Sequence, residues 1–242
     1  MSSNYYFFKN KNRLASFLLA SFIIISFIEI IAEYCEDKFL IWGTKPFIIP
    51  FLLAYYLSLT KKSNYYFLVA MLFSWVANLL FIENTLTWII YGSTFFLIYR
   101  MIIIYIVMNK IKMPSLVPLI LGSIPFIFIY AMICFLSFEA MGDNIYLFLT
   151  HGIFNIFLGG LSLGNYIMVL SKSNLFLFLS TMLFALTQFS FVIKVYYEDT
   201  NVFQAMAMLM FVIGQFLLTK FIFLTEESNS KHETMDKSNL YN

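Results

Sequence analysis

Polar side chains that could do chemistry lie within stretches of sequence that are otherwise almost wholly apolar. They are Glu29, Asn78, Arg100, His151, Asn155, Asn165, Gln188, Lys194, Gln204 and Gln215, with Lys45 at the edge of one such stretch. Carboxyl and imidazole groups can transfer protons, whereas amides can only form hydrogen bonds. Guanidinium and ammonium groups can hold a phosphate. Because such side chains are costly inside a membrane, they usually face a bundle interior or a cavity, and we expect the functional site among them.

The spacing of these residues places several of them on shared helix faces. His151 and Asn155 are four residues apart, as are Ser74 and Asn78, and residues with this spacing are neighbours on an α-helix. The same pattern is also typical of helix–helix contacts, in which small residues allow close approach and amides bond across the interface. Both interpretations remain open from the sequence.

The charged residues have structural alternatives as well. Arg100 needs a carboxylate, a ligand phosphate or several carbonyls as partners, and an Arg100–Glu29 pair meets that need within the protein. Lys45 and Lys194 could instead extend their ammonium groups to the membrane surface.

Several kinds of site are excluded or disfavoured. His151 and His232 are the two histidines, so a catalytic zinc site, which takes three protein ligands, is not expected. Cys35 and Cys134 form neither a disulfide framework nor a metal motif. The sequence contains no G-x-S-x-G elbow, no P-loop and no dinucleotide fingerprint. We therefore expect no metal and no cofactor.

The composition identifies the class of protein. The chain has 242 residues, of which 61% are hydrophobic and only 12% charged, and its mean hydropathy is +0.83. Soluble domains are nearer half apolar and a quarter charged, so most of this chain is expected to lie in lipid. The net charge of +2 gives no reason to expect a nucleic-acid partner. The apolar run 14–32 is not followed by a small-x-small cleavage site, so we interpret it as a transmembrane helix and not as a signal peptide.

Hydropathy predicts an all-α bundle of about eight transmembrane helices. A helix that crosses the hydrocarbon core needs about 20 mostly apolar residues. The predicted spans are 14–32, 41–60, 65–82, 88–107, 116–138, 146–170, 175–195 and 202–224. Residues 1–13 form a short preceding segment, and the polar tail 225–242 is expected to be disordered. Pro46 and Pro50 lie near the predicted start of the second helix, where proline is tolerated.

Loop charges predict the orientation. With eight crossings, Lys and Arg gather in the terminal segments and in alternate loops, whereas the opposite loops are rich in Asp and Glu. Cytoplasmic loops are the Lys/Arg-rich ones, so both termini are expected to be cytoplasmic. Most of the polar residues then fall in the outer halves of their helices, which predicts a cavity open toward the outer leaflet. A composition rich in Phe, Ile, Lys and Asn suggests a bacterial inner membrane, and the sequence indicates no oligomeric state.

Four short motifs resemble those of a known family. They are TKPFIIP at 44–50, FSWVANLLF at 73–81, LFALTQFSFVIK at 183–194 and VIGQFLL at 212–218. Their order and spacing are similar to those of the YhhN family of lysoplasmalogenase-like membrane proteins, over roughly residues 45 to 224. The resemblance implies hydrolysis of the vinyl-ether bond of lysoplasmalogens, with release of an aldehyde and a glycerophospho-headgroup, and hence a membrane lipid or lysolipid as the partner.

The resemblance also assigns positions, with two departures. Lys45, Asn78, Gln188 and Gln215 occupy polar positions of the family, but Asn78 and Gln188 stand where the family has aspartate. Vinyl-ether hydrolysis needs a proton delivered to carbon and then water, and an amide cannot deliver a proton.

The candidate residues follow from this chemistry. The candidate catalytic residues are Asn78, Gln188, Glu29 and His151, the last two as proton donors. The candidate substrate-binding residues are Lys45, Arg100, Asn155, Lys194 and Gln215. Two other readings are a non-catalytic relative that binds or moves an amphiphile in a retained cavity, and a structural or partner-binding membrane protein.

Overall fold

The computed structural model describes the backbone of residues 2–60, 63–83 and 85–239, and the side chains of 13–60, 63–83 and 85–228. Within these residues the chain forms helices and no strands. In order they are α1 (Ser2–Cys35), α2 (Lys38–Leu59), α3 (Tyr65–Leu80), α4 (Leu86–Lys110), α5 (Leu116–Met141), the 3₁₀ turn Gly142–Asn144, α6 (Ile145–Met168), α7 (Lys172–Tyr196) and α8 (Asn201–Asn239). Every predicted span overlaps one of these helices, so the all-helical fold is confirmed.

Length and composition give the chain a multi-pass membrane character. Six described stretches are long and apolar enough to cross a membrane, and one of them, Leu116–Met168, comprises α5, the 3₁₀ turn and α6. The apolar α3 has 16 residues and is shorter than that criterion.

Helices α1 and α8 extend furthest beyond their predicted limits. Helix α1 continues to Cys35, and α8 continues to Asn239, so helical backbone extends into the tail expected to be disordered. At the end of α1 the backbone of Glu36 has a positive φ of 54°, and the Asp37 carboxylate accepts hydrogen bonds from the Phe39 and Leu40 amides at 3.0 and 3.1 Å. This N-cap starts α2 directly after α1.

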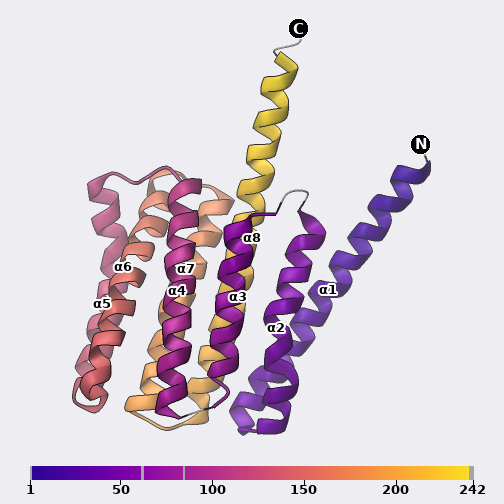
Figure 1. Ribbon diagram of the computed structural model, residues 1–242. Coiled ribbons are helices and arrows are strands. Elements are labelled where there is room, and N and C mark those ends of the chain that lie inside the picture. The colour runs from indigo at the N-terminus through magenta and orange to yellow at the C-terminus, as the bar shows by residue number, and fades with distance from the viewer. Residues whose placement is uncertain (1, 61–62, 84, 240–242) are drawn as a thin grey trace.

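The helices form a bundle in which the pairs α1–α2, α3–α4, α5–α6 and α7–α8 pack most closely (Figure 1). Both chain termini lie at one end. The connections α1–α2, α3–α4, α5–α6 and α7–α8 lie at the other end, called here the loop end (Figure 1). The C-terminal parts of the odd-numbered helices therefore meet the N-terminal parts of the even-numbered helices there.

Helix α2 contains two prolines that the sequence placed near its start. Because α2 begins at Lys38, Pro46 and Pro50 lie inside it. Pro50 has no N–H, so the Pro46 carbonyl lacks its helical partner. The Trp75 indole of α3 donates a hydrogen bond of 2.8 Å to this carbonyl. The proline is accommodated because a neighbouring helix satisfies the freed acceptor.

Close backbone approach joins α5 to α6. A Cβ atom at Gly122 would lie 2.7 Å from the Gly164 nitrogen, and one at Gly164 would lie 2.8 Å from the Pro118 carbonyl oxygen. These contacts involve backbone, which cannot move aside as a side chain can. Small residues therefore set the separation of α5 and α6.

We expect Gly164→Ala to lower the thermal stability of the detergent-solubilised protein, because overpacking of this kind costs roughly 1–3 kcal/mol. The matched control is Gly43→Ala, since a Cβ there meets nothing within 4 Å. Melting temperatures of both variants test this. Equal stability of the two variants contradicts the close α5–α6 contact.

Candidate functional site

A cavity lies between the helices toward the loop end of the bundle. It encloses about 1060 Å³, counting its open mouth. Its walls are largely aromatic and aliphatic, and they include Phe81, Phe96, Phe184 and Phe211. The polar and charged side chains on its walls include Glu33, Lys45, Asn78, His151, Gln188 and Gln204. Concave apolar sites with a few polar groups are typical of small-molecule binding sites.

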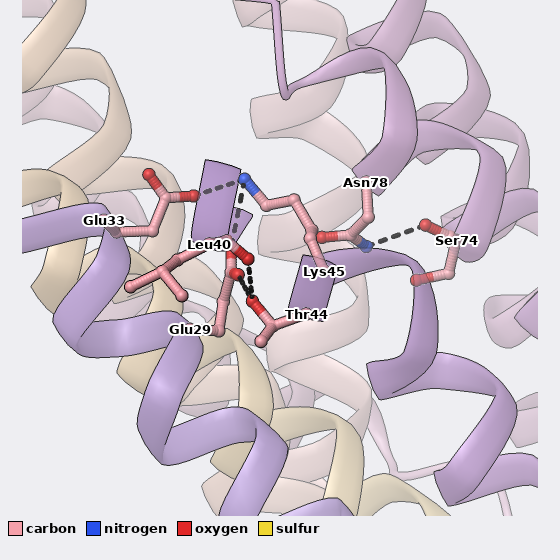
Figure 2. Close-up of polar contacts among 7 residues, drawn as sticks. All are labelled: Glu29, Glu33, Leu40, Thr44, Lys45, Ser74 and Asn78. Atoms are coloured by element: carbon pink, nitrogen blue, oxygen red, sulfur yellow. Dashed lines mark hydrogen bonds and ion pairs between the residues drawn. The ribbon is translucent and has the colours of Figure 1, made fainter. Parts of the chain in front are cut away.

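One wall carries a buried cluster of charges from α1 and α2 (Figure 2). The Lys45 ammonium forms a close ion pair with Glu33 Oε1 and lies 3.6 Å from Glu29 Oε1. The side chain of Lys45 is 4% exposed and that of Glu29 is 0% exposed. Lys45 is thus held inside the bundle, and the alternative in which it extends to the membrane surface does not describe this structure.

Glu29 lies behind this ion pair and does not line the cavity. Its Oε2 bonds with the Thr44 hydroxyl, which is also 2.7 Å from the Leu40 carbonyl oxygen. Its Oε1 is buried and makes no hydrogen bond within the described part of the chain. Two carboxyl groups therefore share a single ammonium group in this cluster.

Asn78 lines the cavity on the other side of Lys45 (Figure 2). Its amide nitrogen donates to the Ser74 carbonyl at 2.8 Å. The Ser74 hydroxyl accepts from Gln215 Nε2 at 2.8 Å, and Gln215 Oε1 accepts from the Tyr99 hydroxyl at 3.1 Å. Gln215 is fully buried and joins α3, α4 and α8. It does not line the cavity. It takes part in a helix–helix contact, which is one of the two interpretations that the sequence allowed for such polar residues.

A second polar cluster surrounds Gln188 on α7. Its amide oxygen accepts hydrogen bonds from Arg100 Nη1 at 3.2 Å, the Tyr130 hydroxyl at 2.6 Å and Asn155 Nδ2 at 2.8 Å. Gln188 lines the cavity, while Arg100 and Asn155 lie behind it. Three donors on one oxygen make a site that suits an anionic acceptor, and here an amide oxygen occupies it.

Arg100 is held without a carboxylate partner among the described residues. Its guanidinium is buried, lies 5.3 Å from the ring centre of Phe96, and donates a hydrogen bond of 3.5 Å to the His151 carbonyl. The expected alternative of an Arg100–Glu29 pair is wrong for this structure, since Glu29 contacts Lys45 instead. Aromatic and amide partners compensate the cation in its place.

His151 on α6 has a defined orientation. Its Nε2 lies 3.0 Å from the Ser93 carbonyl oxygen, and a carbonyl can only accept, so Nε2 carries the proton. Its Nδ1 is then an acceptor, and this atom is buried with no hydrogen-bond partner within the described residues. In this arrangement the imidazole presents a base to its surroundings, whereas the sequence suggested a proton donor.

Lys194 lies near the loop end, in the last turn of α7 before the segment that precedes α8. Its ammonium forms ion pairs with Asp199 and, at 3.4 Å, with Glu36. It is not among the residues on the cavity walls.

The predicted residues thus fall into three groups. Lys45, Asn78, His151 and Gln188 line the cavity; Glu29, Arg100 and Asn155 support lining residues from behind; Lys194 and Gln215 lie apart. Sequence reasoning missed Glu33, which was placed just beyond the first span although it follows Glu29 by one helical turn. It also missed Tyr130, which no pattern separates from the other tyrosines. In the described part of the chain no three His, Cys, Asp or Glu side chains are placed to hold a metal ion.

We expect Lys45→Met to destabilise the folded protein strongly, because it leaves two buried carboxyl groups without their cation, and breaking a buried pair costs about 3–5 kcal/mol. The matched control is Lys194→Met, whose partner Asp199 is 88% exposed and whose loss should cost about 0–1 kcal/mol. Thermal unfolding of the purified variants measures both. A smaller loss for Lys45→Met than for Lys194→Met would show that the α1–α2 ion pair does not stabilise the bundle.

Comparison with known proteins places this site in a family. The family model described as the YhhN family matches residues 40–222. No curated protein and no solved structure matches the chain. The matched range contains the described residues that line the cavity, with the exception of Glu33. Since the match covers well more than half of the chain, the chain belongs to the YhhN family.

Proposed function

We propose that this chain is an integral membrane hydrolase that cleaves the vinyl-ether bond of lysoplasmalogen-type lysolipids. Family membership and the cavity at the loop end support this function. The single observation that carries it is the combination of apolar walls with a small set of polar groups in one cavity. Apolar walls suit a hydrocarbon chain, and the polar groups suit the ether oxygen and the headgroup.

The proposed reaction assigns separate tasks to the side chains on the walls. The amides of Asn78 and Gln188 can orient water and the substrate by hydrogen bonds, but they cannot supply the proton. The Lys45 ammonium lines the cavity and can donate a hydrogen bond to the headgroup while it stays paired with Glu33. Arg100 and Asn155 act indirectly, because they hold the Gln188 amide oxygen and so direct its nitrogen.

Hydrolysis is tested with purified protein and a lysolipid that carries a vinyl ether. We expect one aldehyde to be released for each lipid consumed. The matched substrate is the alkyl-ether lysolipid with the same headgroup, which lacks the double bond that accepts the proton and should stay intact. If neither choline nor ethanolamine vinyl-ether lysolipids are consumed by the wild-type protein, this function is wrong.

A specific observation favours a second candidate, a relative that binds an amphiphile without cleaving it. Asn78 and Gln188 are amides at positions where the resemblance implies aspartate, and the Gln188 oxygen is already held by three donors. A lipid that co-purifies in stoichiometric amount without turnover supports this candidate. Gain of hydrolysis in the double variant Asn78→Asp/Gln188→Asp, starting from an inactive wild type, supports it further.

We also propose that all eight helices cross a bacterial inner membrane with both termini in the cytoplasm. The Lys/Arg bias of the loops supports this orientation, and the two termini lie at the same end of the bundle (Figure 1). In this orientation the cavity lies toward the outer leaflet, where a lysolipid can enter from the membrane.

Cys35 offers a direct test of this orientation, because it is exposed at the loop end, whereas Cys134 lies within α5. We expect a membrane-impermeant maleimide to label intact spheroplasts, and the label to be lost in Cys35→Ser. A cysteine introduced by Ser228→Cys in the Cys35→Ser background should react only after permeabilisation. The reverse pattern contradicts the proposed orientation.

A further inference from the structure

We propose that Glu33 is the general acid and base of this site, so that α1 supplies the carboxyl group that α3 and α7 lack. The inference rests on the proposed hydrolase function and names the residue that moves the proton. It assigns a supporting role to Glu29 and Lys45, which share charge with Glu33.

The first support is position. Among the described residues that line the cavity, Glu33 is the one carboxylic acid. Glu29 is buried behind it, and the Nε2 proton of His151 is directed at the Ser93 carbonyl. Glu33 and Asn78 lie on either side of Lys45 (Figure 2), so the carboxyl group lies across Lys45 from the position at which the resemblance implies aspartate.

The second support is a charge count. Two carboxylates and one ammonium leave an excess negative charge in a place where the side chains are almost wholly buried. The cluster is neutral when the two carboxyl groups carry one proton between them, and this is the form in which Glu33 can act as a general acid.

The third support is the reach of Lys45. Its ammonium contacts both carboxyl groups, so it can stabilise whichever of them is ionised. When Glu33 gives up its proton, the new carboxylate forms beside a cation already in place. Preorganised charge of this kind lowers the energy of a transition state without reorganisation.

The family match begins at residue 40, so Glu29 and Glu33 lie outside the matched range.

The reaction balances with one water molecule. The Glu33 O–H bond breaks, and the electrons of the alkenyl double bond form a new bond between the proton and the carbon remote from oxygen. The carbon bonded to the ether oxygen then becomes an oxocarbenium ion. Water adds to the cationic carbon and returns a proton to the Glu33 carboxylate, giving a hemiacetal. The hemiacetal C–O bond then breaks, its hydroxyl proton moves to the departing oxygen, and an aldehyde and the glycerol hydroxyl are released.

The test compares Glu33→Gln with Glu36→Gln, a change in the turn directly after the same helix and outside the cavity walls. Loss of general acid–base catalysis should lower the rate of aldehyde release at least about 10²-fold in Glu33→Gln, with little change in Glu36→Gln. Melting temperature and retention of bound lysolipid report whether each variant is folded, and Glu33→Asp should keep part of the activity. Hydrolysis by Glu33→Gln at close to the wild-type rate overturns this inference and leaves the proposed function intact. A wild type without hydrolysis overturns both.

Discussion

The buried ion pairing of Lys45 with Glu33 and Glu29 is the interaction on which the arrangement of the helices around the cavity most depends. It joins α1 to α2 through two carboxyl groups in a bundle that offers few other polar partners. A lone carboxylate or ammonium is far too costly in such surroundings, so the three side chains must be present together. Their placement in turn requires the short turn at Glu36 and Asp37, which brings the end of α1 beside the start of α2.

In the Gln188 cluster the charge of Arg100 is compensated in a different way. Arg100 is buried without a carboxylate among the described residues, and it is held by amide, carbonyl and aromatic groups. Tyr130 and Asn155 fix the same amide oxygen, so Gln188 cannot turn without breaking three hydrogen bonds. The cavity thus has one wall, at Glu33, where protons can be exchanged. It has another wall, at Gln188, where hydrogen bonds hold the side chain in place.

The sequence predicts the helices well because each one carries a long apolar run whose signal does not depend on its neighbours. It also places most of the polar residues in the half of the bundle where the cavity lies. It does not predict the partners, since pairing depends on how helices pack. Glu29 could have met Arg100 or Lys45, and only the α1–α2 turn decides in favour of Lys45. The sequence does not single out Glu33, because the apolar run that predicts the first span ends one residue before it. In the structure the helical backbone continues to Cys35 and so includes Glu33.

The amide at position 78 is consistent with the acids on α1. Asn78 lies on the other side of Lys45 from Glu33 (Figure 2). An aspartate there would place a third carboxyl group beside a buried cluster that has one ammonium, and like charges brought together disfavour ionisation of each other. A chain that carries Glu29 and Glu33 therefore gains from a neutral side chain at position 78. On this argument, Asn78, at the position where the resemblance implies aspartate, is the electrostatic counterpart of placing the acid on α1.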